Sequence, residues 1–529
     1  MGEFKGTVFD TRSITKIRFS TKPGESISSG SLIEVRGSDN KKYLGRVTSI
    51  QRKSYLIDRD SAVQLSSLFS ENEKLRLDDI GITHEFEDFL ICEAEIIGRR
   101  RENSNFFERP KRPFKIGTKV FEASQEFLNE QLEPQNKKSI KIGSFRDNED
   151  VLINIDLNEL ISKHFSVLAM TGSGKSWTIS VIIESIASEY DIPILIFDPH
   201  GEYSSLKVPR KEEGEIISKK TKVFVAADEY TKQLSDEMFK NKFGKERESE
   251  ALYFNITDLE TYQVIHLLKS LYDLSEAQTR IIQAGWTDVV NDPELKDTPN
   301  IDRITEKLDD VAKDVTQGIS AQRILKTKLQ MLYDTLPYIR KVTNQKIIKE
   351  EELVKKGQIS VIDISGIEAV QQQALVAVLS SRILHKRMEG KIPPLLLILE
   401  EAHRYIPSGT VNTASKPTIK RVAQEGRKFL MGLGIVSQRP SRVDDDVLSQ
   451  CNTQIIMRLT NPTDQNYVKK VSEWVSESDL EEIKTMNPGE AFVFGSAVPI
   501  SLPVKIKEKR LTKHGGYTPD IIDELENFQ

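Results

Sequence analysis

Ten residues, LAMTGSGKSW at 168–177, have the types and the spacing of a loop that holds a phosphate. Three small residues, Gly172, Ser173 and Gly174, let backbone N–H groups point at an anion without side chains in the way. An apolar run precedes the loop and a helix-like run follows it, so we expect a strand, the loop and a helix in that order. The positive end of the helix dipole would then face the anion. The stretch therefore predicts a phosphate site.

Two side chains after the small residues supply further chemistry. Lys175 can reach the outer phosphates, and the Ser176 hydroxyl is placed to ligate Mg²⁺. The P-loop pattern is broken at Ala169, which stands where the first glycine is expected and which the turn tolerates if its φ stays negative. A chance Gly/Ser turn is the alternative interpretation. The predicted ATP-binding set is Thr171, Gly172, Ser173, Gly174, Lys175, Ser176 and Trp177.

Two acids end a second apolar run, LLLILEEAH at 395–403. Hydrolysis of ATP needs one carboxylate for the Mg²⁺ shell and another for the attacking water. We assign Glu400 to the Mg²⁺ shell, partly through water, and Glu401 to the general base. Gln438 ends the apolar run IVSQ and is placed to hydrogen-bond the γ-phosphate or the water. An ordinary acidic loop and ordinary strand-end capping are the alternatives.

A third polar strand end is DPHGEY at 198–203. Asp198, His200 and Glu202 are therefore expected near the nucleotide, with roles left open. A histidine at a strand end is usually structural, and no second His or Cys stands at ligand spacing. We expect no metal other than Mg²⁺.

The bulk composition bounds the class of protein. The chain has 529 residues, 38% of them hydrophobic, which suffices for three or four soluble domains. Its net charge of −5 excludes a globally basic surface, so any DNA contact must be local. Cys92 and Cys451 give neither a disulfide framework nor a metal spacing. With no apolar signal core and no long apolar run, we expect a cytoplasmic protein without a membrane segment.

The pattern of apolar runs predicts the architecture. Short alternating runs over 1–120 predict a small β-barrel. Apolar strands then alternate with helices, which predicts a doubly wound parallel α/β sheet. The strands at 193–201 and 358–366 are about 160 residues apart, so a subdomain is inserted between them, and its helical periodicity predicts a bundle. Beyond the barrel, we expect a first core segment at 121–204, the helical insertion at 205–350, a second core segment at 351–500 and a solvated charged tail at 501–529.

A basic run at 98–115 interrupts the barrel region and surrounds Phe106 and Phe107. It could grip phosphates, or it could be a solvated hairpin tip, and both interpretations stay open. Its cations are Arg99, Arg100, Arg101, Arg109, Lys111, Arg112 and Lys115.

Taken together, the motifs resemble the HerA branch of the HerA/FtsK translocase superfamily. The resemblance covers most of the chain, through the barrel, KHFSVLAMTGSGKS, DPHGEY, LLLILEEAHRYIP and QEGRKFLMGLGIVSQRPSRV. Glu-Glu followed by Ala-His and the SQRPS strand end are typical of this group. The resemblance implies a HAS-type barrel and a RecA-like P-loop core that forms a homo-hexamer and translocates double-stranded DNA without sequence preference. It also implies a partner nuclease or phage-defence effector docked on the barrel.

The resemblance also implies roles for single residues. Lys175 and Ser176 match the Walker A pair, Glu400 and Glu401 the Walker B pair, and Gln438 the polar sensor. A neighbouring subunit should supply an arginine finger. Our first candidate for that finger is Arg427, followed by Arg421 and Arg458.

Two further features bear on the resemblance. Lys163-His164 stands where members commonly have Arg-His, and Lys lacks the planar fork of Arg. The segment 407–421 fits a pore loop, with Lys416 and Lys420 as candidates to contact DNA; a flexible surface loop is the alternative.

Two rival functions remain: an ATP-binding scaffold ring that organises an effector, and a conjugation- or secretion-type transport ATPase. Direction of travel, partner identity and the choice between six and seven subunits stay open.

Overall fold

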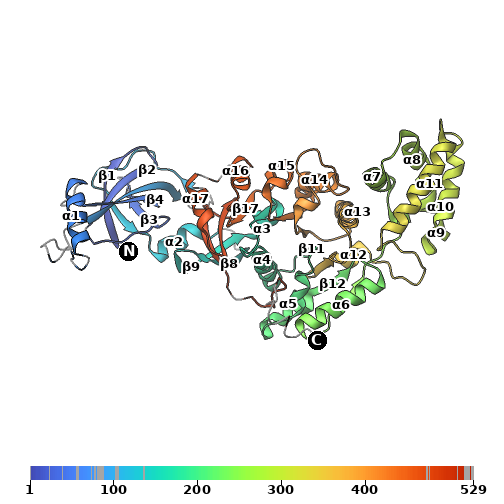
Figure 1. Cartoon of the computed structure of the whole chain (residues 1–529), viewed down its shortest axis with the longest axis horizontal. Helices are drawn as coiled ribbons and strands as arrows, with labels where there is room; N and C mark the ends of the chain where they lie inside the picture. Colours follow the sequence, from blue (N-terminus) through green and yellow to red (C-terminus); the bar gives the residue numbers. More distant parts are fainter. Residues whose placement is uncertain are drawn as a thin grey trace. The chain divides into compact units, whose positions relative to one another are not determined.

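In the computed structural model, the chain forms two compact units, residues 1–156 with 498–505 and residues 157–497 with 506–529 (Figure 1). Among the described residues, no helix is long and apolar enough to cross a membrane. The structure describes all residues except 1, 23, 38–39, 55–58, 73, 75, 77–78, 80–87, 102–106, 135–137, 472–474, 476, 509, 517–524 and 526–529.

The first unit begins with a closed β-barrel. The strand order is β2-β1-β7-β3-β4-β5-β6, and β2 also pairs with β5, which closes the barrel and leaves six strands without a free edge within the described residues. The strand pairs of the barrel are antiparallel, as in β1 with β2 and β4 with β5. The strands are β1 (Phe4–Thr11), β2 (Lys16–Thr21), β3 (Leu32–Arg36), β4 (Lys42–Ser54), β5 (Asp88–Arg100), β6 (Phe107–Glu108) and β7 (Lys119–Glu122), with α1 (Arg59–Glu71) after β4.

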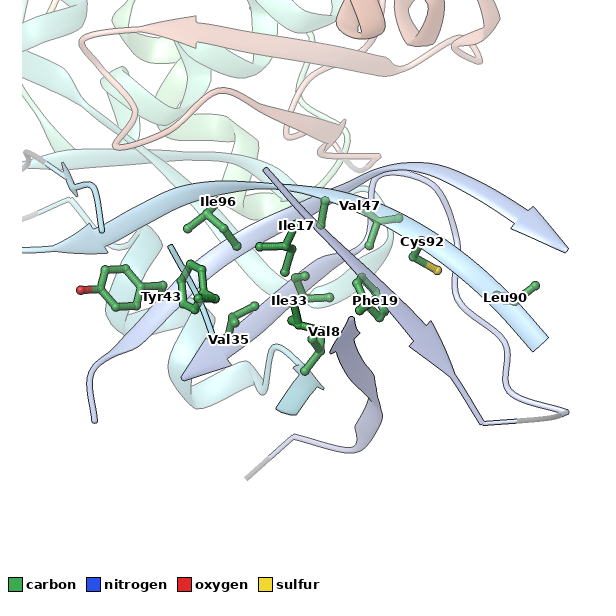
Figure 2. Packing of buried hydrophobic residues seen from close by; sticks show 13 residues of the cluster. Val8, Ile17, Phe19, Ile33, Val35, Tyr43, Val47, Leu90, Cys92 and Ile96 are labelled. Atoms are coloured by element: carbon green, nitrogen blue, oxygen red, sulfur yellow. The ribbon is translucent and has the colours of Figure 1, made fainter. Parts of the chain in front are cut away.

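Apolar side chains fill the barrel (Figure 2). Ile33 and Val35 lie two residues apart on β3 and face the same cluster, as the period of a strand requires. Cys92 is buried in this cluster as a free thiol. Burial of these side chains holds the barrel together. The same unit contains α2 (Gln125–Leu132), the hairpin of β8 (Ser139–Phe145) with β9 (Asn148–Asp156), and all but the last residue of β19 (Leu502–Ile506).

The basic run predicted at 98–115 belongs to this unit, and Phe106 and residues 102–105 lie outside the described residues. The Arg100 guanidinium donates to backbone carbonyls of α2, at 3.3 Å from Glu130 O and 3.5 Å from Gln131 O. Lys111 lies 3.8 Å from the Glu108 carboxylate. Both interpretations of the run remain predictions.

The second unit contains a mostly parallel sheet. Its order is β13-β12-β14-β11-β15-β16-β10-β17-β18, and only the pairing of β17 with β18 is antiparallel among those described. Most of the strands are buried along their whole length, which explains their continuous apolar runs. The strands are β10 (Phe165–Leu168), β11 (Ile194–Asp198), β12 (Thr221–Val225), β13 (Ser249–Ala251), β14 (Ile359–Asp363), β15 (Leu395–Leu399), β16 (Met431–Ser437), β17 (Thr453–Met457) and β18 (Glu490–Gly495).

Helices accompany this sheet, and the longest of them connect its parallel strands. They are α3 (Leu157–Ser162), α4 (Lys175–Glu189), α5 (Glu215–Lys220), α6 (Glu229–Phe243), α12 (Glu350–Leu353), α13 (Ala369–Met388), α14 (Lys416–Glu425), α15 (Asp445–Ser449), α16 (Pro462–Val471) and α17 (Glu477–Thr485). Because all the parallel strands point the same way, their carboxyl ends meet at one edge of the sheet. The P-loop, the acidic pair and DPHGEY each follow such an end.

A helical bundle is inserted between β13 and β14. It comprises α7 (Thr261–Tyr272), α8 (Glu276–Asn291), α9 (Pro293–Asp297), α10 (Ile301–Ala312) and α11 (Gly318–Thr335), which gather in one group, green to yellow in Figure 1. Trp286 is fully buried in it, and its indole N–H donates to Leu259 O at 2.7 Å. The fold-class prediction is confirmed, while the domain bounds stay predictions: the span 205–350 also holds β12, α6 and β13.

The C-terminal residues differ from the expected solvated stretch. Arg510 is 4% exposed because its guanidinium pairs with the buried Glu184 carboxylate of α4 at 3.2 Å. Lys505 forms an ion pair with Glu149 at 2.8 Å. The prediction of a solvated tail is therefore wrong for Arg510, whereas the Lys505 pair is partly exposed to solvent, and Lys509 lies outside the described residues.

Candidate functional site

The loop of residues 169–174 joins β10 to α4 as the sequence predicts. Its entry is held by backbone bonds from Ala169 N–H to Ser437 O at 3.2 Å and from Met170 N–H to Arg458 O at 3.0 Å. Ala169 has no positive φ, so the missing first glycine is tolerated. The neighbouring strands β16 and β17 thus fix where the loop begins.

Two glycines shape the rest of the loop. Gly172 has φ +80° and Gly174 has φ +101°, a region that side chains rarely adopt. A Cβ at Gly174 would also lie 3.3 Å from Met457 Cε. Between them, the Ser173 hydroxyl donates to Met170 O at 2.6 Å, so its side chain serves the turn itself. Gly174 is the N-cap of α4, whose first N–H groups face the loop.

Lys175 lies between the two predicted acids. Its Nζ is 2.8 Å from Glu400 Oε1 and 2.5 Å from Glu401 Oε1. All three side chains are buried, with 10%, 3% and 4% of their surfaces exposed. Burial alone would lower the pKa of Lys175, but the two carboxylates outweigh it and the pKa is raised. The ammonium is therefore charged and shared by both acids.

Glu400 has a second partner that the sequence analysis missed. The Tyr203 hydroxyl donates to Glu400 Oε2 at 3.0 Å, and Tyr203 is 1% exposed. Burial raises the pKa of Glu400 while Lys175 opposes it, and burial also raises the pKa of Tyr203 well above its ordinary value. Tyr203 closes the stretch DPHGEY, but only the fold shows that it faces an acid 197 residues away.

Glu401 keeps one oxygen without a hydrogen bond. Its backbone is left-handed, with φ +52°, at the point where the chain leaves β15. Oε1 meets Lys175, whereas the buried Oε2 has no hydrogen bond in the described structure, although His403 Nδ1 lies 3.2 Å away. Burial lowers the pKa of His403, so we assign it a neutral ring. A buried carboxylate oxygen without a donor is costly unless something occupies that position in function.

Gln438 follows β16 and bonds the loop. The Thr171 hydroxyl donates to Gln438 Oε1 at 2.6 Å. This contact joins the predicted sensor to the predicted phosphate loop across 267 residues of sequence. The arrangement brings the two strand ends of β10 and β16 to the same place.

One cavity of about 530 Å³ connects these groups, a volume typical of small-ligand sites. Most of the residues predicted to bind ATP line this cavity; Ser173 is not among the described lining residues. His200 and Glu202 are also in the wall, as expected, and His514 is an addition that no signal in the sequence indicated. The lining is Met170, Thr171, Gly172, Gly174, Lys175, Ser176, Trp177, His200, Glu202, Glu400, Glu401, Gln438, His514 and Gly516.

Asp198 does not line the cavity. It is fully buried and accepts the backbone N–H groups of His200, Glu202 and Tyr203 at 3.3, 3.2 and 2.8 Å. Burial and the neighbouring Asp363 raise its pKa well above the ordinary value. Asp198 therefore shapes the loop that carries the cavity residues.

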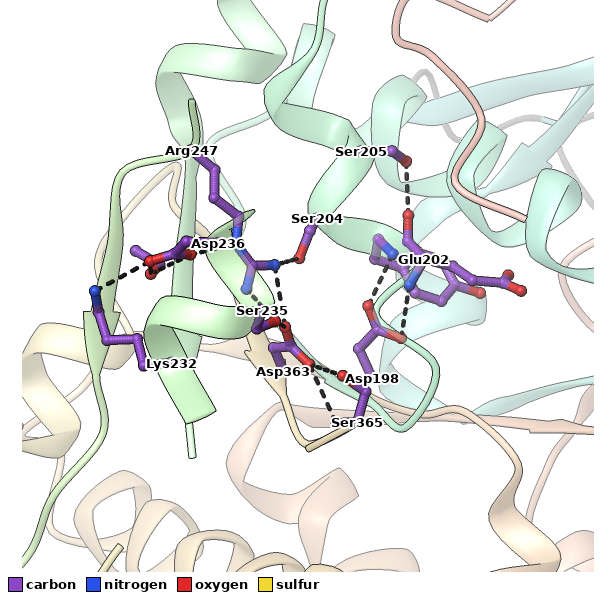
Figure 3. Close-up of polar contacts among 12 residues, drawn as sticks. Asp198, Glu202, Ser204, Ser205, Lys232, Ser235, Asp236, Arg247, Asp363 and Ser365 are labelled. Atoms are coloured by element: carbon purple, nitrogen blue, oxygen red, sulfur yellow. Dashed lines mark hydrogen bonds and ion pairs between the residues drawn. The ribbon is translucent and has the colours of Figure 1, made fainter. Parts of the chain in front are cut away.

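A buried polar network supports the same loop (Figure 3). Arg247 pairs with Asp363 at 3.0 Å and donates to the Ser204 hydroxyl at 2.9 Å. It also pairs with Asp236 of α6 at 2.6 Å. The network fixes the segment after β11 against α6 and the end of β14.

The residues present fit Mg²⁺. Ser176 and Glu400 line the same cavity and offer the hydroxyl and carboxylate oxygens that Mg²⁺ prefers, with phosphate oxygens as its further ligands. Within the described residues, no group of three or more His, Cys, Asp or Glu side chains could hold a metal by itself. The predicted ligation stays a prediction.

The three candidate arginine fingers lie outside the described lining of this cavity. Arg427 is exposed on a short helix after α14, Arg458 is exposed after β17, and Arg421 pairs with Glu425 at 3.1 Å. Exposure is what a residue needs to reach the site of a neighbouring chain. Their assignment as fingers stays a prediction.

Lys163-His164 serves the fold. The neutral His164 ring accepts the Leu433 N–H at Nδ1 and donates from Nε2 to Ala423 O, both at 3.0 Å. Burial, together with the charge of Arg427, lowers the pKa of His164. Lys163 pairs with Glu159 at 2.6 Å. Among the described residues, neither lines the cavity.

The candidate pore lysines are engaged within the chain. Lys416 is 7% exposed and donates to Pro407 O and Gly409 O, both at 2.8 Å. Lys420 pairs with Asp444 at 3.2 Å and with Asp446 at 2.7 Å. In this structure, Lys416 is not an accessible DNA contact, because it is buried and organises its own loop.

The chain is similar to known proteins. Residues 140–383 match the family model "Helicase HerA, central domain". The chain is 30% identical to the DNA double-strand break repair helicase HerA of Pyrococcus furiosus over 100% of this chain and 98% of that protein. It is 28% identical to the protein of that name from Saccharolobus solfataricus, over 93% of this chain and 90% of that protein. VirB4 of Thermoanaerobacter pseudethanolicus is similar at 12% identity and TM-score 0.48, covering 71% of this chain and 98% of that chain.

Proposed function

The chain belongs to the HerA helicase family and is an ATPase, and from this premise we propose that it uses ATP hydrolysis to move along double-stranded DNA. The observation that carries the proposal is the placement of Lys175 between Glu400 and Glu401 in the cavity that the P-loop lines. A cation for the phosphates and two carboxylates for metal and water are the groups that phosphoryl transfer requires.

Binding would use the loop first. The N–H groups around Gly172 and Gly174 and the start of α4 face an anion, and Lys175 adds a full positive charge. In this structure, that charge is shared by the two acids. A terminal phosphate would compete for it, so binding would draw Lys175 away from Glu401 and leave that carboxylate to act on water. This competition couples occupancy of the site to activation of its base.

Glu401 would then orient the attacking water and accept its proton. Its Oε2 is buried and without a hydrogen bond in the described structure, so it offers an acceptor at the cavity. Glu400, held by Tyr203, and Ser176 would hold Mg²⁺, which neutralises charge that develops on the phosphates. Gln438, fixed by Thr171, would sense the γ-phosphate.

We further propose that the chains assemble into a hexameric ring with duplex DNA in its pore. The names of the relatives, DNA double-strand break repair helicases, support a role on DNA. The net charge of −5 means that the grip on the phosphate backbone comes from local cations. A nuclease or a phage-defence effector would dock on the barrel, and Arg427 of one chain would complete the neighbouring site.

The test is ATP turnover with and without duplex DNA in the wild type and in Glu401→Gln. Duplex should stimulate the wild type, and the variant should lose turnover by about 10²-fold or more because the base is absent. Glu306→Gln, an exposed position in α10, is the matched control and should behave as the wild type. Turnover that ignores DNA, with assembly unchanged, would instead favour a scaffold that binds ATP.

A further inference from the structure

The C-terminal strap, defined as residues 510–516, contributes to the wall of the nucleotide cavity. His514 and Gly516 line that cavity together with Lys175 and Ser176. The strap follows β19 by only a few residues, and nothing in its sequence resembles a nucleotide-binding motif. The fold therefore places a segment without a recognisable motif beside the P-loop.

A buried anchor ties the strap to α4. Glu184, 4% exposed, accepts from Arg510 Nε and Nη2 at 3.2 Å each and from the Leu511 N–H at 2.8 Å. It also accepts the Thr512 N–H at 3.1 Å and the Thr512 hydroxyl at 2.6 Å. Because α4 begins at Lys175, the strap is attached to the helix that carries the phosphate-binding lysine.

A second set of contacts joins the strap to the segment after β11. The Arg210 N–H donates to Leu511 O, and the Lys513 N–H donates to Val208 O, both at 2.9 Å. The approach is closest at Gly515, where a Cβ would lie 1.9 Å from Glu202 O. Glycine is needed there so that the strap can lie against the loop that carries Glu202.

Trp177, which follows the phosphate loop in sequence, packs against the strap. Its indole N–H donates to Lys507 O at 2.9 Å. The Arg510 guanidinium lies 5.4 Å from the indole centroid, and the His514 ring meets the indole edge-on at 5.6 Å. These contacts fix the ring of His514 at the cavity.

The hydrogen bonds of His514 decide which ring nitrogen carries the proton. Arg510 Nη1 lies 3.3 Å from His514 Nδ1, and because a guanidinium can only donate, Nδ1 accepts. Burial and the nearby Arg510 lower the pKa of His514, so the ring is neutral and its proton sits on Nε2. A Cβ at Gly516 would lie 3.1 Å from both Nε2 and Glu202 Oε1, so only glycine keeps close contacts away from this donor and from the carboxylate of the cavity wall.

We propose that the C-terminal strap completes the nucleotide site from within the same chain, and that the Nε2–H of His514 donates a hydrogen bond to the bound nucleotide. The inference deepens the proposed function and rests on it, since it takes the cavity as the ATP site. The acceptor is an electronegative atom of the nucleotide, on a phosphate or on the nucleoside. Arg510 and Glu184 act as positioning residues, because they hold the strap without lining the described cavity.

The experiment measures the affinity of the full chain for a fluorescent non-hydrolysable ATP analogue, with unlabelled inorganic triphosphate as a competitor. His514→Ala should weaken the analogue about tenfold, the effect of losing one hydrogen bond to the ligand. Lys513→Ala, an exposed neighbour on the same strap, should bind as the wild type. If triphosphate weakens by the same factor, the acceptor is a phosphate oxygen; if only the analogue weakens, the acceptor belongs to the nucleoside.

Gly515→Ala supplies an independent arm, since it displaces the strap without removing a polar side chain. It should weaken the analogue at least as much as His514→Ala does, and a thermal unfolding scan beside it should show a single cooperative transition, so that the chain is still folded when affinity is measured. Wild-type affinity in both variants would overturn the inference. Lys175→Ala distinguishes failure of the strap proposal from failure of the proposed function. Loss of binding in that variant alone would overturn the role of the strap and leave the ATP site in place. A wild type that binds no nucleotide would overturn the proposed function as well.

Discussion

At the scale of single residues, the site is organised around one ammonium shared by two acids. Lys175 is within 2.8 Å of both Glu400 and Glu401, and all three are buried. Removing one partner from a buried ion pair leaves an uncompensated charge, which costs far more than a surface pair contributes. Lys175 therefore stabilises the fold, in addition to its proposed role in binding nucleotide.

This arrangement predicts a stability effect of Lys175→Met. The variant should lose about 3–5 kcal/mol of unfolding free energy, because two carboxylates lose their counter-ion. Chemical denaturation without nucleotide measures the loss. Adding Glu401→Gln to Lys175→Met should restore part of it, and the exposed Lys428→Met should stay within about 0.5 kcal/mol of the wild type. A Lys175→Met protein as stable as the wild type would contradict the shared ion pair.

Tyr203→Phe tests the second support of Glu400. Without the hydroxyl that donates at 3.0 Å, Glu400 Oε2 loses a buried partner, at a cost of about 1–3 kcal/mol in the site. We expect turnover to fall about tenfold and the Mg²⁺ concentration for half-maximal activity to change. Tyr262→Phe removes a hydroxyl that bonds Ser381, away from the cavity, and should leave both values unchanged. Equal behaviour of the two variants would show that Tyr203 does not position Glu400.

At the scale of elements, His164 joins β16 to α14 just before the P-loop strand begins. Its ring accepts from Leu433 and donates to Ala423 while its own backbone has φ +59°. The bond from Leu433 requires a neutral ring, because a protonated Nδ1 cannot accept, whereas the donation to Ala423 would survive protonation. The junction is therefore sensitive to acid.

The folded-state pKa of His164 lies below its ordinary value of 6.5, so between these values the unfolded chain binds the extra proton. This contribution to stability is fully present above pH 6.5 and is lost as the pH falls toward the lowered pKa. His164→Asn, which suits the left-handed backbone, should be less stable at pH 7.5 and should lose less stability between pH 6.5 and 5. Urea unfolding across this range measures it. The exposed His266→Asn should keep the wild-type slope, and an unchanged slope in His164→Asn would refute the assignment.

The strands and their polar ends could be predicted because each is a continuous stretch with its own pattern. LAMTGSGKSW and LLLILEEAH carry their spacing within a few residues, and parallel strands bring their ends together. The contacts of Tyr203 with Glu400 and of His514 with Trp177 join residues far apart in the chain, so no local pattern indicates them. The prediction that Lys416 contacts DNA relied on its charge, which suggested exposure. In the fold, three backbone carbonyls and Asp444 surround its ammonium, and no local pattern indicates these contacts.

At the scale of the whole molecule, the proposed function couples a site that binds a nucleotide to movement along a duplex. Charge alone does not draw this chain to DNA, because its net charge is −5. If local cations grip the backbone, stimulation of turnover by duplex should fall steeply as salt rises, while turnover without DNA should change little. Stimulation that is insensitive to salt would point to contacts other than phosphates.

Displacement of a third strand from a DNA triplex tests translocation most directly, because a motor that moves along the duplex strips the third strand whether or not it unwinds the duplex. With ATP and Mg²⁺, the wild type should release the third strand, and the release should stop with a non-hydrolysable analogue or in Glu401→Gln. Hydrolysis of ATP on the same substrate with the third strand still in place would contradict the proposed translocation.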